Sequence, residues 1–474
     1  AVLVADPADP ASRRVAYQAK GAVSVADVSP DKSRLLLERN LSNRETRLAL
    51  LDLASGQVSE LPWTGEPARY EVSRFVPGRD AILTVTDYRS DLRRLVEIDL
   101  GSGKRTPVSP TLDWDVEDYD MTADGRLLAY AVNQDGYSRV RIIDRSTGAE
   151  LASPGLPGGV LSGFEFSPDG SKLALSMTTA RSAGDVWTWD LATSRLTPWT
   201  SSELGPIDPA SLSEPKLIRF NSFDGLSVPA FVYRPAGIAP DARTPVVIDI
   251  HGGPESQTRP IFNPIAQQIA NAVGATVILP NVRGSDGYGK RYLNHDNGPK
   301  SKDSVKDIGA LLDWIAAQPN LDNDRVAVYG QSYGGYMSLA SMAHYSDRLV
   351  GAVERYGISD FITFLTNTES YRRDNRRAEY GDERDPEMRA VFQRINPLAN
   401  VSKIRKPMLV MQGANDPRVP QSESEQVVAG IRANGVESWY VLYADEGHGF
   451  LKKHNNDLRR EVETVFLKRL FEGK

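Results

Sequence analysis

Short apolar runs recur at regular intervals over the first 200 residues. Each run follows a turn signal, and the turns centre on positions 30, 77, 123 and 168, at intervals of 47, 46 and 45 residues. An aspartate that ends a short alternating segment keeps the same period. These aspartates are Asp52, Asp99, Asp144 and Asp190. The pattern therefore predicts that each unit consists of short strands joined by turns, since no helical period is present.

A unit of about 45 residues with four short strands has the size of a β-propeller blade. A β-sandwich with accidental spacing is the alternative. The turn signals and the aspartates both keep the same period over four units, which favours the propeller. We expect residues 1–200 to form four full blades and part of a preceding one, because Asp6 lies 46 residues before Asp52. Residues 1–20 would then be the outer half of an incomplete blade. We expect no closed seven-bladed ring in this chain.

An open propeller leaves unpaired strand edges, which invite association. We therefore expect either an upstream segment of the full gene product or a partner chain, such as a second copy, to cover that edge.

The rhythm changes after residues 201–216, a stretch rich in Ser and Pro that we interpret as a linker. In residues 217–474, apolar runs alternate with helical patterns. The runs lie at 246–250, 275–279, 325–329, 408–411 and 439–443, and the candidate helices near 303–317, 333–345, 421–433 and 457–471. This alternation predicts a mostly parallel, doubly wound sheet covered by helices on both faces.

Composition narrows the classes of function. The chain has 474 residues, enough for two domains, and a formal net charge of −6, which gives no reason to expect nucleic acid or an anionic membrane as a partner. No apolar run reaches the ~20 residues of a membrane span. Cysteine is absent, which excludes disulfides and thiolate sites, and no metal or cofactor motif occurs. The compartment stays open: cytoplasmic, or periplasmic or secreted if a signal peptide was removed.

Ser332 lies in the sequence Gly-Gln-Ser-Tyr-Gly of residues 330–334, which fits G-x-S-x-G. The motif directly follows an apolar strand and directly precedes a helical pattern, as a nucleophile elbow requires. By itself the motif is weak, because glycine and serine are common. Its position predicts an α/β-hydrolase domain with Ser332 as the nucleophile.

A serine nucleophile needs a base, and in this fold the acid and then the histidine follow the serine along the chain. Of the five histidines, only His448 and His454 lie beyond the later strands, and His448 is flanked by glycines. Asp416 is the only carboxylate of the segment 413–420, which follows the preceding strand. We predict the triad Ser332, Asp416 and His448; the alternative for Asp416 is a turn-capping aspartate.

The segment His-Gly-Gly-Pro at 251–254 resembles the HGGG-type loop that supplies an oxyanion donor. We assign the oxyanion hole to the backbone N–H groups of Tyr333 and Gly253. His251 is expected to shape this loop rather than to act as a base.

In combination, these motifs resemble the prolyl oligopeptidase family of serine peptidases, most closely its acylaminoacyl-peptidase and dipeptidyl-aminopeptidase branch. The matching segments are 251–254, 281–289, 330–337, 413–420 and 445–450. The propeller half matches by architecture only. The resemblance implies a propeller that admits short peptides and excludes folded proteins. Family propellers commonly have seven blades, more than are visible here.

The resemblance also implies binding residues. Arg418 matches a family arginine that binds a substrate backbone carbonyl; the alternative is a surface ion pair. Phe361 and Phe364 lie in a segment that usually lines the pocket for the residue before the scissile bond, although they could equally be core residues. We find no propeller glutamate pair of the dipeptidyl-peptidase kind, so endo- and exopeptidase action both stay open.

The leading hypothesis is hydrolysis of short peptides through an acyl-enzyme intermediate. A carboxylesterase or lipase acting on small acyl esters is the nearest alternative, because the same triad cleaves esters, but small esters need no propeller as a size filter. The third hypothesis is a catalytically inactive propeller-mediated binding protein, against which the intact triad argues.

Overall fold

The computed structural model describes residues 1–19, 21, 23–61 and 66–473. The chain divides into two compact units. The first contains residues 1–178, 184–202 and 287–291, and the second contains residues 179–183, 203–286 and 292–474.

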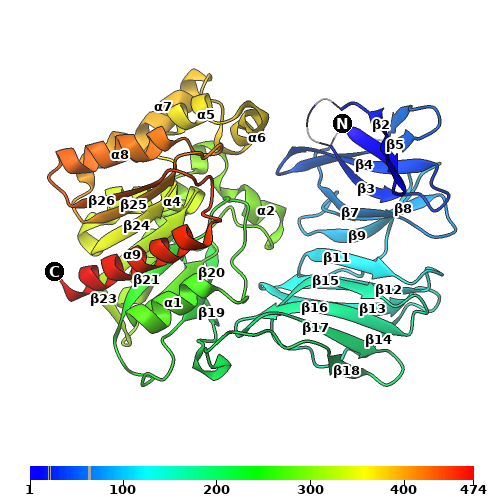
Figure 1. The fold of residues 1–474 in the computed structure, drawn as a ribbon, viewed down its shortest axis with the longest axis horizontal. Coiled ribbons are helices and arrows are strands. Elements are labelled where there is room, and N and C mark those ends of the chain that lie inside the picture. Colours follow the sequence, from blue (N-terminus) through cyan, green and yellow to red (C-terminus); the bar gives the residue numbers. More distant parts are fainter. Residues whose placement is uncertain (20, 22, 62–65, 474) are drawn as a thin grey trace. The chain divides into compact units, whose positions relative to one another are not determined.

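Four antiparallel sheets of four consecutive strands each make up most of the first unit within its described residues (Figure 1). Each sheet is a meander, so every strand pairs with the next one along the chain. The strands are β3 (Ser24–Val28), β4 (Arg34–Ser42), β5 (Glu45–Asp52) and β6 (Val58–Glu60); β7 (Tyr70–Phe75), β8 (Ala81–Thr86), β9 (Arg94–Asp99) and β10 (Arg105–Pro107); β11 (Val116–Met121), β12 (Leu127–Gln134), β13 (Tyr137–Asp144) and β14 (Ala149–Leu151); and β15 (Val160–Phe166), β16 (Lys172–Thr179), β17 (Ser182–Asp190) and β18 (Arg195–Pro198).

The repeating aspartates are turn residues. Asp52, at the end of β5, accepts hydrogen bonds from the backbone N–H and the hydroxyl of Ser55, and Asp99 does the same with Ser102. Hydrogen bonding to the ionised carboxylate lowers the pKa of both groups. The period visible in the sequence is therefore a period of hydrogen-bonded turns.

The start of the chain forms a two-stranded antiparallel sheet of β1 (Val2–Asp6) and β2 (Asp9–Tyr17). Val2 packs with Leu35, Leu37 and Leu51 of the next sheet. β1 ends at Asp6, 46 residues before the end of β5 at Asp52, as the repeat predicts for the third strand of a blade. Residue 20 lies outside the described residues, and the cover for the edge of this sheet stays a prediction.

One eight-stranded sheet forms the centre of the second unit, in the order β19-β20-β22-β21-β23-β24-β25-β26. The pairs β19–β20 and β20–β22 are antiparallel, and all the others are parallel. The strands are β19 (Lys216–Asn221), β20 (Ser227–Tyr233), β21 (Thr244–Ile250), β22 (Thr276–Pro280), β23 (Leu321–Gln331), β24 (Gly351–Arg355), β25 (Met408–Gly413) and β26 (Ser438–Tyr443).

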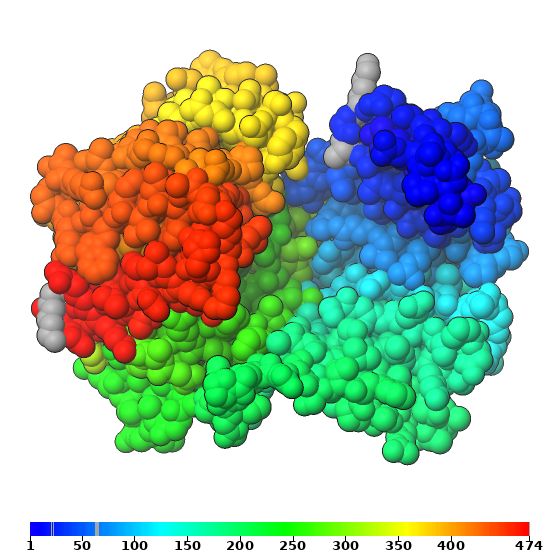
Figure 2. Space-filling model, in the orientation of Figure 1, coloured from blue at the N-terminus to red at the C-terminus, as the bar shows by residue number. Residues whose placement is uncertain are grey.

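Helices cover both faces of this sheet. Val246 and Ile248 of β21 pack into one core with α3 and α4, while Val247, which points to the opposite face, is also fully buried. The helices are α1 (Pro264–Gln268), α2 (Gly289–Leu293), α3 (Asp303–Ala316), α4 (Tyr333–Tyr345), α5 (Phe361–Asn367), α6 (Ser370–Tyr380), α7 (Pro386–Ile395), α8 (Gln421–Ala433) and α9 (Lys453–Glu472). Helices α5, α6 and α7 gather at one end of the unit (Figure 1), and α9, in red, lies at its surface (Figure 2).

No helix of the described residues is long and apolar enough to cross a membrane.

Candidate active site

Ser332 stands alone between β23, which ends at Gln331, and α4, which begins at Tyr333. Its backbone has φ 56° and ψ −119°, a conformation that residues with a Cβ rarely adopt. Side chains at Gly330 and Gly334 would collide with the carbonyl oxygens of Gly334 and Ile250, respectively. The two glycines of the motif therefore permit a turn that is too tight for any other residue.

The structure brings the three predicted triad residues together. His448 Nε2 lies 3.1 Å from Ser332 Oγ, and His448 Nδ1 lies 2.7 Å from Asp416 Oδ2. The Asp416 side chain is fully buried and that of His448 is 11% exposed. A proton on Nδ1 faces the carboxylate, which leaves the Nε2 lone pair directed at the serine hydroxyl.

The candidate acid and base come from two neighbouring loops that bind each other. Asp416 follows β25, and its Oδ1 accepts the backbone N–H groups of Arg418 and Val419 at 2.7 and 3.0 Å. The Asn415 N–H donates to the carbonyl of Glu446 at 2.9 Å, two residues before His448. Both loops leave the carboxyl ends of adjacent parallel strands, the edge at which α/β sheets bind ligands.

Tyr356 contacts His448, the candidate base, although its sequence context carries no motif for such a role. The centroid of its ring lies 4.7 Å from the centroid of the His448 ring, and its hydroxyl donates to Gln331 Oε1 at 2.7 Å. It follows β24 with a positive φ of 39°. The sequence signal that could have found it is its position at the end of the strand beside the nucleophile strand.

The predicted oxyanion loop passes close to Ser332, the candidate nucleophile. A Cβ at Gly252 would lie 3.2 Å from the carbonyl oxygen of Gln331 and 3.4 Å from the Cβ of Ser332, so a side chain here would be tightly packed. His251 is half-buried, and desolvation lowers its pKa. Its Nδ1 and Nε2 contact Gly252 O and Ser285 Oγ at 2.8 and 2.9 Å. Both ring nitrogens are engaged within the loop region, as expected for a histidine that shapes the loop.

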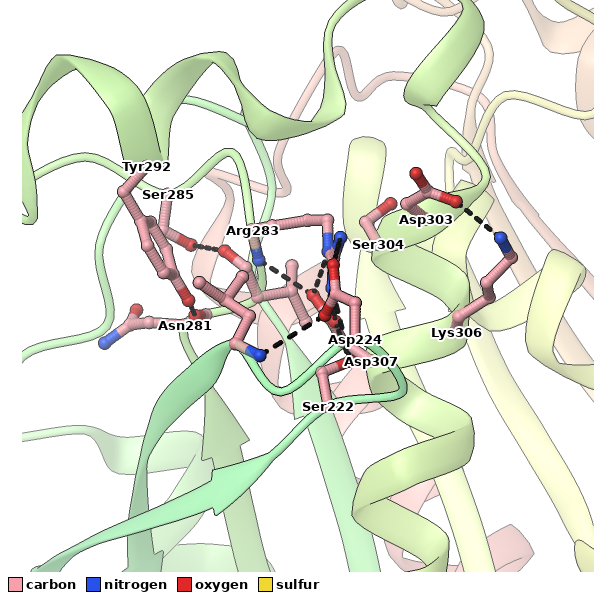
Figure 3. A network of polar contacts seen from close by, with 12 residues as sticks. Ser222, Asp224, Asn281, Arg283, Ser285, Tyr292, Asp303, Ser304, Lys306 and Asp307 are labelled. Atoms are coloured by element: carbon pink, nitrogen blue, oxygen red, sulfur yellow. Dashed lines mark hydrogen bonds and ion pairs between the residues drawn. The ribbon is translucent and has the colours of Figure 1, made fainter.

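Ser285 belongs to a loop that a buried arginine holds in place (Figure 3). The guanidinium of Arg283 donates to Asp307 at 2.8 Å and, through two nitrogens, to Asp224 at 3.0 Å. The backbone N–H of Arg283 also donates to Asp307, at 3.0 Å. Arg283 is only 2% exposed, so this pairing connects α3 to the loop that contacts His251.

Below the elbow, the Tyr333 hydroxyl donates to Asp296 Oδ2 at 3.1 Å and lies 2.9 Å from Ser304 Oγ. Burial raises the pKa of Asp296 to about 8, so that this carboxyl is mostly protonated at neutral pH. The contacts fix the ring of Tyr333, whose backbone N–H we predict to be an oxyanion donor.

Residues 261–474 match the sequence model of the prolyl oligopeptidase family. This part of the chain is a prolyl oligopeptidase domain. A relative, dipeptidyl aminopeptidase BIII of Pseudoxanthomonas mexicana, is 34% identical over 237 residues, which are 49% of this chain and 34% of the relative. Dipeptidyl peptidase family member 6 of Caenorhabditis elegans is 32% identical over 51% of this chain and 33% of its own length. The chain therefore aligns with about a third of each of these relatives.

Solved structures extend the likeness to both units. A puromycin hydrolase superposes with a TM-score of 0.87 over 98% of this chain and 72% of that chain, at 21% sequence identity. At this identity the likeness shows the fold alone. The predicted fold class, a β-propeller that precedes an α/β-hydrolase domain, is confirmed.

The remaining predicted residues of the prolyl oligopeptidase domain lie in different environments. Arg418 is exposed, and among the described residues no carboxylate lies within ion-pairing distance of its side chain. Phe361 and Phe364 of α5 are buried in the core, where Phe361 packs on Tyr336 and Phe392. Their burial favours the core alternative, and their role in a substrate pocket stays a prediction.

Proposed function

We propose that this chain is a serine peptidase that hydrolyses short peptides through an acyl-enzyme intermediate. The observation that carries the proposal is the continuous contact from Asp416 Oδ2 through the His448 ring to Ser332 Oγ, at 2.7 and 3.1 Å. A general base within this reach is what an unactivated hydroxyl needs in order to attack a carbonyl.

In the proposed mechanism, Ser332 Oγ attacks the peptide carbonyl carbon while His448 Nε2 takes the hydroxyl proton. The backbone N–H groups of Tyr333 and Gly253 stabilise the oxyanion of the tetrahedral intermediate, and each such donor typically contributes ~3 kcal/mol. His448 then gives its proton to the leaving amine, which leaves an acyl-enzyme. A water molecule attacks the acyl carbonyl while His448 takes its proton, and the return of that proton to Ser332 Oγ releases the carboxylic acid. Asp416 keeps the imidazole in the required tautomer and stabilises the imidazolium.

The substrates are proposed to be short peptides, because relatives are named dipeptidyl aminopeptidase and acylamino-acid-releasing enzyme. A peptide library assayed beside short acyl esters tests this choice. We expect higher kcat/KM for peptides than for esters, and the position of the cut separates endo- from exopeptidase action. Turnover of esters alone would instead favour the carboxylesterase alternative.

Replacement of the nucleophile tests the mechanism itself. Ser332→Ala should lower kcat by about 10⁶-fold, and His448→Ala by a similar factor, because triad members act as a unit and their losses do not add. Labelling by a fluorophosphonate should also disappear in Ser332→Ala. Wild-type peptidase activity in either purified variant would contradict the proposed mechanism.

A further inference from the structure

Helix α6 runs between the two loops of the candidate active site. Two residues before its start, Thr368 Oγ1 donates to the carbonyl of Arg418 at 2.8 Å, in the loop of the candidate acid. At its other end, Tyr380 Oη donates to the carbonyl of Gly253 at 3.2 Å, and Arg376 Nη1 contacts the same oxygen at 3.3 Å. One face of this helix therefore borders the place where a substrate must lie.

That face is rich in positive charge. Arg372 and Arg376 are four residues apart and so lie on the same side of α6. Arg376 forms an ion pair with Glu255 at 3.3 Å. Burial, reinforced by the charges of Arg376 and Arg418, lowers the pKa of Arg372. The guanidinium of Arg372 is thus repelled by the charges of both Arg376 and Arg418.

Two of these arginines lack a counter-ion among the residues that the structure describes. Within the described part of the chain, no carboxylate lies within ion-pairing distance of the side chain of Arg372 or Arg418. Other arginines of α6 are engaged: Arg373 donates to Thr368 O, and Arg377 pairs with Glu383. A half-buried guanidinium without a partner is unfavourable, and an external anion would remove that cost.

We propose that Arg372 and Arg418 form a subsite that binds a carboxylate of the peptide substrate. The inference rests on the proposed peptidase function and adds a substrate class to it. A guanidinium has five N–H donors, so Arg418 can bind a backbone carbonyl and still share a carboxylate with Arg372. The carboxylate can belong to an acidic side chain near the scissile bond or to the free C-terminus of a short peptide.

Binding to the inactive Ser332→Ala protein measures the subsite apart from turnover. Peptides that differ only by Glu or Gln, placed in turn at each position around the cleavage site, are titrated by calorimetry. C-terminal acid and amide forms of one neutral peptide make the second arm. We expect the carboxylate form to bind about tenfold more tightly in one of the two arms, which identifies its source.

The same titrations are repeated after substitutions in the Ser332→Ala background. Arg372→Gln should bring the affinity ratio close to one, whereas Arg372→Lys should keep part of it. Arg405→Gln is the matched control, since Arg405 is exposed and the loss of charge is identical; its ratio should equal that of the parent. Melting temperatures verify that each variant is folded.

Equal affinities in both arms, or an unchanged ratio in Arg372→Gln, would overturn the subsite. Hydrolysis of the neutral peptides by the wild-type protein is measured separately. If the subsite alone is wrong, that hydrolysis persists and still depends on Ser332. If the peptidase function is wrong, hydrolysis is absent even where carboxylate binding is detected.

Discussion

At the scale of single residues, backbone groups rather than side chains orient the candidate acid. Two N–H groups, those of Arg418 and Val419, occupy Asp416 Oδ1 and leave Oδ2 for His448. The side chain of Arg418 takes no part in this arrangement. It can therefore be changed without disturbing the triad, which makes its own role open to measurement.

Arg418→Lys should lower kcat/KM for peptides by about tenfold, because lysine cannot reproduce a forked two-donor contact. The melting temperature should barely move, because the side chain is exposed and unpaired among the described residues. Steady-state kinetics and a thermal melt give both quantities. A collapse of thermal stability with normal kinetics in the surviving protein would instead give the Arg418 side chain a structural role.

At the scale of elements, the predictable helices are the long ones, of 13 to 20 residues, because more turns make the helical period easier to detect. Helices α3, α4, α8 and α9 lie where the 3.6-residue pattern predicts them, whereas the same pattern does not reveal α5, α6 and α7. In α6 only Glu379 and Tyr380 are buried, so contacts with loops rather than an apolar face hold it. The usable sequence signals were caps, such as Asp360 before α5 and Asp385-Pro386 at the start of α7.

The pairing of Arg283 with Asp307 is predicted to act on turnover as well as on stability. Arg283→Met should lower the free energy of unfolding by about 3–5 kcal/mol, because it leaves Asp307 buried without its partner. Adding Asp307→Leu should restore most of that loss. We expect kcat to stay at least about tenfold low in the double variant, since the loop that contacts His251 is no longer held.

Urea unfolding and kcat of the wild-type, single and double variants provide the comparison. Recovery of both quantities in the double variant would mean that the pairing serves the fold alone. Low kcat with recovered stability would instead mean that Arg283 positions the predicted oxyanion loop.

At the scale of the whole molecule, the local patterns were predictable and the non-local neighbours were not. The blade period appears in the sequence because each blade is a meander of consecutive strands. The order β22-β21-β23 cannot be read locally, because it joins strands that are far apart in the chain. The candidate triad was predictable because each of its three residues lies in a local motif. No motif surrounds Tyr356 or Arg372, so the contact of Tyr356 with His448 and the place of Arg372 were not predictable.

Buried carboxyl groups give the molecule a predictable response to pH. Burial raises the pKa of Asp296 and of Glu354 to about 8, while in the unfolded chain both titrate near 4. Between these values each of these two carboxyls binds more protons in the folded state than in the unfolded state, so their contribution to the free energy of unfolding falls as pH rises. Asp296→Asn should flatten this slope by about 1.4 kcal/mol per pH unit.

Urea titrations at pH 5, 6 and 7 measure the slope. Asp324→Asn is the control, because Asp324 is mostly exposed and the change in charge is the same; its slope should equal that of the wild-type protein. An unchanged slope in Asp296→Asn would mean that Asp296 is ionised in the folded protein.

The positive φ of Ser332 is expected to lower the stability of the fold while the proposed activity requires a serine at this position. Ser332→Ala and Ser332→Gly both remove the hydroxyl, but only alanine keeps the Cβ that disfavours this conformation. Ser332→Gly should therefore be more stable than Ser332→Ala by about 1 kcal/mol, measured by chemical denaturation. Equal stabilities would mean that the turn is unstrained. If the difference is present, selection for a robust fold alone would favour losing the nucleophile, and only selection for turnover would keep a serine there.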